Sequence, residues 1–332
     1  MNHRSRRVVG LCVVLGTVGL ASLAIGPVRL SIPEVIQALS GGPTSGTSQA
    51  ATIIWELRLP RVALAALVGM SLGAAGAAFQ GLFRNPLADP FVIGASSGSA
   101  LGATLVIVAG GTSGAIGFGA VPLGAFAGAV GAAGLVYATT AWWGRMPLVG
   151  LLLAGSAVSS CLGSLVWLLM VLHDEDLAKI VAWLMGSLAA RGWPAVRAGG
   201  PYVAVGVLGL GLLSRALDAL SLGEEPAVAL GLPLRRMTGA IVAAASLATA
   251  AAVAMVGVIG FIGLIAPHLA RVLVGSRHRF LLPSSGLTGA ILLLLADDLA
   301  RTIAAPVELP VGVLTALLGG PFFLVVLGTR AR

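Results

Sequence analysis

The feature that most constrains this chain is a series of long apolar segments almost free of charge. Ten can be drawn along the 332 residues, each near the roughly 20 residues that a helix needs to cross a bilayer. They are 8–26, 62–82, 91–110, 119–142, 147–171, 196–214, 237–256, 258–275, 281–297 and 311–328. Because lipid offers the backbone no hydrogen bonds, each must be helical. We predict an all-α, polytopic membrane protein with about ten transmembrane helices.

The composition excludes a large soluble helical bundle. Hydrophobic residues make up 58% of the chain and charged residues only 10%, against about 25% charged in soluble domains. The 47 glycines are typical of helices that pack closely in lipid. Cys12 and Cys161 both lie in apolar runs, so neither a disulfide framework nor a metal site is indicated.

Two of the ten segments require comment. The basic start, residues 1–7, precedes an apolar run and could mark a cleaved signal peptide. However, segment 8–26 is longer than a usual signal core and no small-x-small cleavage site follows it, so we interpret it as the first membrane helix. Segment 258–275 is the weakest prediction, because Pro267 and His268 interrupt it.

The charges between the segments orient the chain. With the N-terminus inside, the inner segments hold 13 basic and four acidic residues, a net charge of +9. The outer segments hold seven basic and eight acidic residues, a net charge of −1. This asymmetry places both termini in the cytoplasm. The inner basic residues are Arg4, Arg6, Arg7, Arg84, Arg145, Arg215, Arg235, Arg236, Arg271, Arg277, Arg279, Arg330 and Arg332. The basic balance therefore reports topology, and nucleic-acid binding is not indicated.

Outside the apolar segments, no stretch is long enough to fold alone, so residues 1–332 are predicted to form a single transmembrane domain. The chain has no GxxxxGK[ST] phosphate-binding motif and no metal-ligand spacing, so its driving energy must come from elsewhere. Residues 68–80 and 255–266 both carry closely spaced glycines and precede proline-containing segments. This weak likeness fits an internally duplicated transporter.

Two polar segments are not explained by insertion of the chain in a membrane. Arg58 and Arg61 flank Pro60 on the outer side, where Pro60 is predicted near a helix start. Arginines here could snorkel to the interface or bind a partner. On the inner side, residues 221–233 (SLGEEPAVALGLP) predict a short helix-turn-helix, divided by Pro226 and ended by Gly231. It could lie among lipid headgroups, or offer apolar residues to a partner: Ala227, Val228 and Leu230.

Ionisable residues near the ends of membrane segments are functional candidates. Asp297, Asp298 and Arg301 lie outside with Glu308, and His268 and Arg271 lie in the eighth segment. Asp298 and Arg301 are spaced to pair on one helix. The scarcity of acids near mid-membrane disfavours the main alternative, an ion-coupled secondary transporter. The same groups are too few and too separated to indicate a membrane enzyme.

A set of motifs in fixed order resembles the FecCD/BtuC family. They are LRLPR (57–61), FRNPLADP (83–90), GASSGSALG (94–102), LLLAG (151–155), WLMGSL (183–188), SLGEEPAVALGLP (221–233), IGFIGLIAPHLAR (259–271), HR…P (278–283), LLLADDLAR (293–301) and ELPVGVLTALLGGPFF (308–323). This family comprises the permease subunits of type II ABC importers for iron–siderophores, haem and vitamin B12. The resemblance spans residues 57–323, most of the chain.

The resemblance implies a permease homodimer in the cell (inner) membrane, working by alternating access. Two copies of a separate ABC ATPase would bind ATP and magnesium, so this subunit carries no cofactor and is not itself an enzyme. A periplasmic or lipid-anchored binding protein would deliver an iron–siderophore, haem or cobalamin. Arg58, Arg61 and Arg301 match outward arginines that dock acidic residues of that binding protein, which favours docking over snorkelling.

The resemblance also implies inner contacts. Segment 216–236 matches the coupling helices that seat in the ATPase, and the residues expected to act there are Leu222, Gly223, Glu224, Glu225, Ala227, Leu230 and Gly231. Asn85 and Leu87 match a cytoplasmic gate. The fifth and tenth segments would line the pathway. Leu148 and Val149 stand where some members carry short polar residues, so no gate role is assigned to these two.

Overall fold

The chain folds into a bundle of helices that matches the ten predicted segments. The computed structural model describes residues 3–330 apart from 27, 29, 43–48, 112–118 and 143–147, and these described residues contain no strand. Arg145, Arg332 and the predicted start of the fifth segment at residue 147 lie outside them. The ten helices are α1 (His3–Ala24), α4 (Leu59–Leu82), α5 (Ala95–Val108), α6 (Ala120–Trp142), α7 (Leu148–Leu172), α9 (Gly192–Leu212), α12 (Leu234–Val256), α13 (Ile262–Val274), α14 (His278–Thr302) and α15 (Val311–Arg330).

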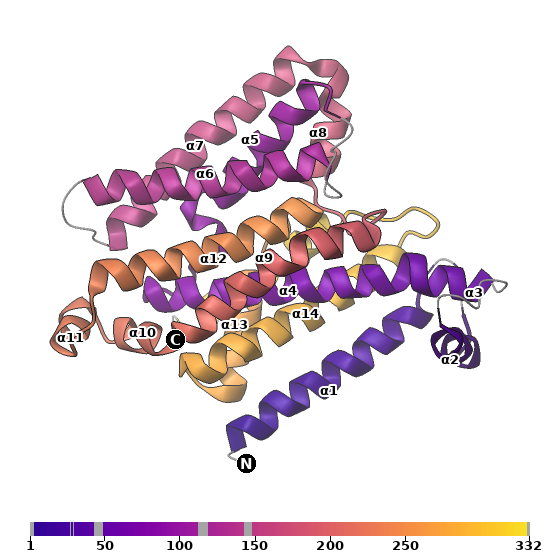
Figure 1. The fold of residues 1–332 in the computed structure, drawn as a ribbon, viewed down its shortest axis with the longest axis horizontal. Coiled ribbons are helices and arrows are strands. Elements are labelled where there is room, and N and C mark those ends of the chain that lie inside the picture. Colours follow the sequence, from indigo (N-terminus) through magenta and orange to yellow (C-terminus); the bar gives the residue numbers. More distant parts are fainter. Residues whose placement is uncertain are drawn as a thin grey trace.

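Seven of these helices are long and apolar enough to cross a membrane, and α5, α13 and α15 are shorter apolar helices. Short helices gather at the two ends of the bundle. In Figure 1, α2 (Ile32–Gly41), α3 (Gln49–Thr52) and α8 (Leu177–Leu184) lie at the right, whereas α10 (Ser214–Ser221) and α11 (Glu224–Ala229) lie at the left. The right end is the outer one by the charge rule, and the left end is the inner one.

Helix α4 is the centre of the bundle, in contact with α14, α12, α13 and α9. Its glycines allow these contacts. A Cβ atom at Gly69 would lie 2.3 Å from the carbonyl oxygen of Gly289, and one at Gly76 would lie 1.9 Å from that of Gly263. The backbones meet directly there, as small residues permit in membrane helices. The predicted use of glycine for close packing is confirmed.

The remaining helices flank this centre. Helices α5, α6 and α7 form a group beside α12, and α1 lies against α14 on the opposite side (Figure 1). Few residues of α1 and α7 are buried within the chain, as expected for helices that meet lipid or another subunit. Both cysteines, Cys12 and Cys161, are exposed there.

The eighth segment differs from its prediction. It was expected to be interrupted at Pro267 and His268, yet both lie inside the continuous helix α13. The break falls earlier, at Gly257 and Phe261, which have φ values of +81° and +67°. A proline removes only one helical hydrogen bond, whereas left-handed backbone ends a helix. The likeness between 68–80 and 255–266 therefore does not extend to structure, since the first lies within α4 and the second contains this break.

Candidate docking, coupling and gate surfaces

The outer arginines are positioned by a widened helical turn. Residues Ile53–Arg58 form a π-helical turn, η1, in which the N–H of Leu59 donates to the carbonyl of Ile54. Helix α4 follows at once, with Pro60 in its first turn as predicted. A wider turn relieves the clash between a proline ring and the preceding turn. It also sends Arg58 toward α1 and Arg61 toward α14.

Arg58 is held at the C-terminal end of α1. Its guanidinium donates to the carbonyl of Leu23, at 2.6 Å, and to that of Val28. The side chain passes so close to Gly26 that a Cβ atom there would lie 2.9 Å from its nitrogen. Only 5% of Arg58 is exposed. The expectation that Arg58 faces outward, free to bind a partner, is therefore wrong for this chain.

Arg301 is also buried, against the same C-terminal end of α1. It is 3% exposed and donates to the carbonyls of Ile25, at 3.1 Å, and Ser22, at 3.4 Å. These carbonyls belong to the last turn of α1 and the residue after it, where the helix has no internal donors left. A cation is also favoured there by the helix dipole. The predicted outward placement of Arg301 is corrected: with Arg58, it caps α1.

An ion-pair network joins α4 to α14 beside these caps. Arg61 binds Asp297 through two nitrogens, at 2.8 and 2.9 Å, and Glu308 at 2.9 Å. Arg301 lies 3.3 Å from Asp297 and pairs with Asp298, which confirms the predicted Asp298–Arg301 pair. Buried charges persist in an apolar interior only when paired in this way. Within the described residues, the two aspartates are thus neutralised at the outer end of α14.

A cavity of about 740 Å³ opens at this outer end. Its lining includes Arg58, Arg61 and Arg301 on one side, and Arg191 from the segment before α9. Arg191 is half-buried and makes no ion pair within the described part of the chain. Burial lowers the pKa of Arg191, but an arginine remains charged at neutral pH. Sequence reasoning missed Arg191, because no pairing pattern surrounds it.

The inner end carries the predicted pair of short helices. Helices α10 and α11 are separated at Gly223, whose φ is +125°, and not at Pro226, which lies in the first turn of α11. The predicted end at Gly231 is confirmed. The N–H groups of Gly231 and Leu232 donate to the carbonyls of Val228 and Ala227, which is the Schellman arrangement that a left-handed glycine permits.

The exposed face of α11 differs from the predicted one. Ala227 has no exposed surface and packs in the main apolar cluster with Leu217 and Leu220 of α10. It was expected to face a partner, and this expectation is wrong, because its small side chain is what lets the two helices close together. Val228 and Leu230 are 54% and 70% exposed, as expected. Other exposed residues here are Leu222, Glu225 and Gly231, while Glu224 is half-buried and Gly223 is buried.

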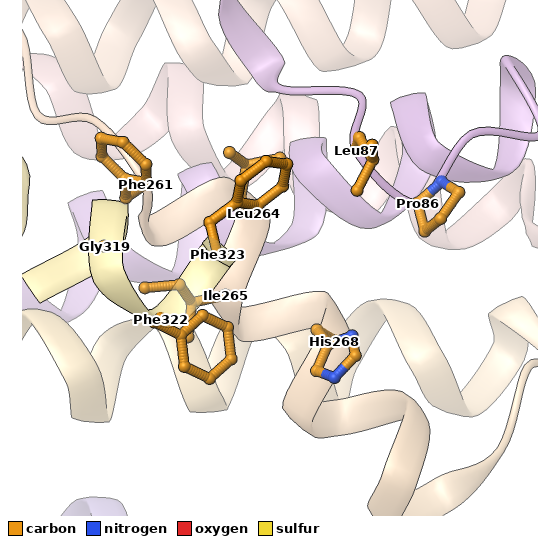
Figure 2. A pocket seen from close by; sticks show the side chains of 9 residues that line it. All are labelled: Pro86, Leu87, Phe261, Leu264, Ile265, His268, Gly319, Phe322 and Phe323. Carbon is orange, nitrogen blue, oxygen red and sulfur yellow. The ribbon is translucent and has the colours of Figure 1, made fainter. Parts of the chain in front are cut away.

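The predicted gate residues lie in the tight loop after α4. The Asn85 side chain accepts a hydrogen bond from the N–H of Leu87, at 2.9 Å. Figure 2 shows Leu87 beside an apolar cavity that Phe261, Phe322 and Phe323 line from the opposite side. The cavity volume is only about 10 Å³, enough for about one water molecule. Asn85 therefore fixes the loop, and Leu87 belongs to a nearly closed apolar contact.

Apolar helices with a charged cavity at one end and paired short helices at the other are the architecture of a multi-pass membrane protein with distinct outer and inner polar surfaces. The pattern of the FecCD transport family matches residues 13–329. The chain therefore belongs to the FecCD transport family, whose members are membrane permeases of ABC importers, and the resemblance inferred from its motifs is confirmed.

Individual relatives agree with this assignment. The chain is 41% identical over 325 residues to the hemin transport system permease protein HmuU of Yersinia pestis, covering 95% of this chain and 92% of the relative. It is 42% identical over 304 residues to the cobalamin import system permease protein BtuC of Halobacterium salinarum, covering 92% and 77%. A metal-chelate type ABC transporter, solved in an inward-facing conformation, matches with a TM-score of 0.85 and 34% identity, covering 98% and 99%.

Proposed function

We propose that this permease works as a homodimer driven by two copies of a separate ABC ATPase, and that it imports an iron–siderophore complex. Haem and cobalamin are the next ligands to test, since relatives are named for them. The observation that carries the proposal is the division of polar groups between the two ends. An arginine-lined cavity lies outside, and short helices with exposed Val228 and Leu230 lie inside.

The outer cavity suits an acidic binding protein. Arg58, Arg61 and Arg301 all contribute to its wall, but Arg58 and Arg301 are committed to the end of α1. We therefore assign direct contact to Arg191, because Arg61 retains only 14% side-chain exposure and is already paired with Asp297 and Glu308. The two buried arginines hold the wall in place. Arginine suits carboxylates because its planar fork makes two parallel hydrogen bonds.

The inner helices suit an ATPase cleft. Leu222, Val228 and Leu230 are exposed apolar residues on a short rigid unit, and Ala227 anchors that unit to the core. Movement of α11 would reach α10 and then α4, which α10 contacts. Leu87, in the loop that follows α4, would then be displaced from its apolar contact, so that nucleotide-driven closure opens the inner gate.

Uptake in proteoliposomes tests the proposal. The permease, its operon-encoded ATPase and the neighbouring binding protein are reconstituted, and uptake of a radiolabelled ferric siderophore is measured. We expect uptake to require ATP and the ATPase, and to persist when a protonophore collapses the proton gradient. Uptake that runs without ATP and stops with the protonophore would establish the ion-coupled alternative, which the neutralised Asp297 and Asp298 disfavour.

The same preparation tests docking. Arg191→Glu should slow uptake at limiting binding protein about tenfold at low salt, because rim charges act mainly on association rates. Arg279→Glu, an exposed change at the inner end of α14, is the matched control and should leave this rate unchanged. Equal rates for the two variants would remove Arg191 from the docking surface.

A further inference from the structure

A second large cavity lies on the side of the bundle, away from the docking cavity and the gate. It has a volume of about 590 Å³ and follows the groove between α6 and α12, two helices that run side by side in Figure 1. Val130 and Tyr137 of α6 face Arg236 and Leu247 of α12 across it. Arg236 is the last residue of the predicted coupling segment, 216–236, and the other three residues lie outside the proposed docking, coupling and gate surfaces.

The groove occupies the inner half of the membrane. From Arg236 to Leu247, α12 rises about 16 Å, close to half the hydrocarbon thickness of about 30 Å. Trp142, at the inner end of α6, is 89% exposed, as is typical of tryptophan at a membrane interface. Toward the outer side, the ring centroids of Phe126 and Tyr202 lie 5.1 Å apart, so this contact brings α6 and α9 together. The groove therefore has the length of one lipid leaflet.

The walls of the groove suit an alkyl chain. Small residues on both helices keep it open, among them Gly134 on α6 and Gly239 and Ala243 on α12. The Tyr137 hydroxyl lies against Gly239, where a Cβ atom would be 2.5 Å from it. One polar group inside has no partner in the described structure: the Ser246 hydroxyl lines the cavity, is buried and makes no hydrogen bond. This hydroxyl lies about 15 Å along α12 from Arg236, at a depth where a lipid offers only its acyl chain, so it takes no part in recognising the headgroup.

The inner mouth of the groove is cationic. Arg236 lines it and Arg235 is adjacent, and both are exposed with no ion pair in the described residues. A second copy that met this groove with the same face would bring Arg235 and Arg236 against their own copies, and these like charges would repel. An anion is favoured there, and basic pockets between membrane helices on this side bind anionic lipid headgroups.

We propose that the α6–α12 groove is a binding site for an anionic phospholipid of the inner leaflet. One acyl chain lies along Gly134, Gly239 and Ala243, and the phosphate pairs with Arg236. Arg236 lies in the first turn of α12 and at the end of the coupling segment, so this lipid also braces the connection from α11 to α12.

Native mass spectrometry of the purified chain tests the site. Phosphatidylglycerol and phosphatidylcholine with the same acyl chains are added in turn, and lipid retention is measured as collisional activation rises. We expect phosphatidylglycerol to be retained preferentially. Arg236→Gln should lower its retention about fivefold, the effect of one arginine near an anionic surface. Arg279→Gln, at the inner end of α14, should not. Equal losses in the two variants would overturn the headgroup assignment.

Two further variants test the groove itself. Ala243→Phe fills it and should reduce retention of both lipids, whereas Val205→Phe, on an exposed part of α9, should not. Unchanged retention in Ala243→Phe would place the lipid elsewhere. The other possible occupant is a second copy of this chain, which Val130→Cys detects in a background without Cys12 and Cys161. A disulfide between two copies at this position would show that the groove is a subunit interface and would overturn the proposal.

Discussion

At the scale of single residues, Asp89 in the loop after α4 makes the stability of the fold depend on pH. Its carboxylate accepts a hydrogen bond from the N–H of Phe91, at 2.9 Å, and so begins the short helix η2 (Pro90–Ile93). Burial nevertheless raises the pKa of Asp89 to about 6, and the hydrogen bond from Phe91 only partly opposes this. The folded chain therefore binds this proton more tightly than the unfolded chain does.

The sign of the pH effect follows from that difference. A carboxyl with a raised pKa destabilises the fold when it is ionised, so stability increases as the pH falls through 6 toward the usual pKa of 3.8. Between pH 7.5 and 5, we expect a gain of about 1 kcal/mol in the free energy of unfolding. Thermal unfolding in detergent at both pH values measures it. Asp89→Asn should abolish that gain, and Glu225→Gln, an exposed change, should keep it. A gain that survives in Asp89→Asn would assign it to another group.

At the scale of helical elements, the pair α10 and α11 has a buried side that anchors it to the core and an exposed side that can contact a partner. The sequence motif alone did not distinguish the two sides. The buried Ala227 joins the pair to the core, and the exposed Leu230 is available to a partner. Bulk or charge at Ala227 would damage the fold before it reported on coupling. Only substitutions on the exposed face can therefore test the contact with the ATPase.

Leu230→Asp is the sharper test of coupling. Because Leu230 is 70% exposed, the permease should keep its unfolding temperature, while its affinity for the ATPase falls at least about fivefold, as for an interface residue worth about 1 kcal/mol. Co-purification and ATPase activity of the complex measure the change. Ser276→Asp, in the exposed turn between α13 and α14, serves as control. If Leu230→Asp binds the ATPase as tightly as this control, α11 is not the contact.

At the scale of the whole molecule, α4 organises the bundle, because four other helices of the bundle pack against it. The closest approach is at Gly76, where a Cβ atom would lie 1.9 Å from the backbone oxygen of Gly263 in α13. A backbone atom cannot rotate away as a flexible side chain can. If any side chain is added at Gly76, α4 and α13 must move apart, and the other helices packed against α4 must shift with them.

Gly76→Ala should therefore destabilise the chain by about 1–3 kcal/mol, the usual cost of overpacking. Gly163→Ala in α7, where nothing lies within 4 Å of the added Cβ atom, should be neutral or slightly stabilising, since alanine favours a helix over glycine. Thermal unfolding midpoints in detergent compare the two variants. A Gly76→Ala protein as stable as the wild type would show that α4 and α13 are farther apart than described.

The long apolar segments by themselves determined how many helices form the bundle, and the charges between them determined their predicted orientation, because both depend on local transfer between water and lipid. The same local rules predicted Pro60 at a helix start, the end of α11 at Gly231 and the Asp298–Arg301 pair. Motif order was enough to indicate the family.

Only the tertiary structure decided which polar residues remain accessible. Arg58 and Arg301 were predicted to face outward but turn inward, because the end of α1 offers carbonyls without donors. Ala227 is buried because α10 and α11 close over it, and Arg191 reaches the outer cavity from a segment distant in sequence. Burial depends on neighbours that the fold brings together, so local patterns cannot predict it. The groove between α6 and α12 has the same origin: its walls come from two helices about a hundred residues apart.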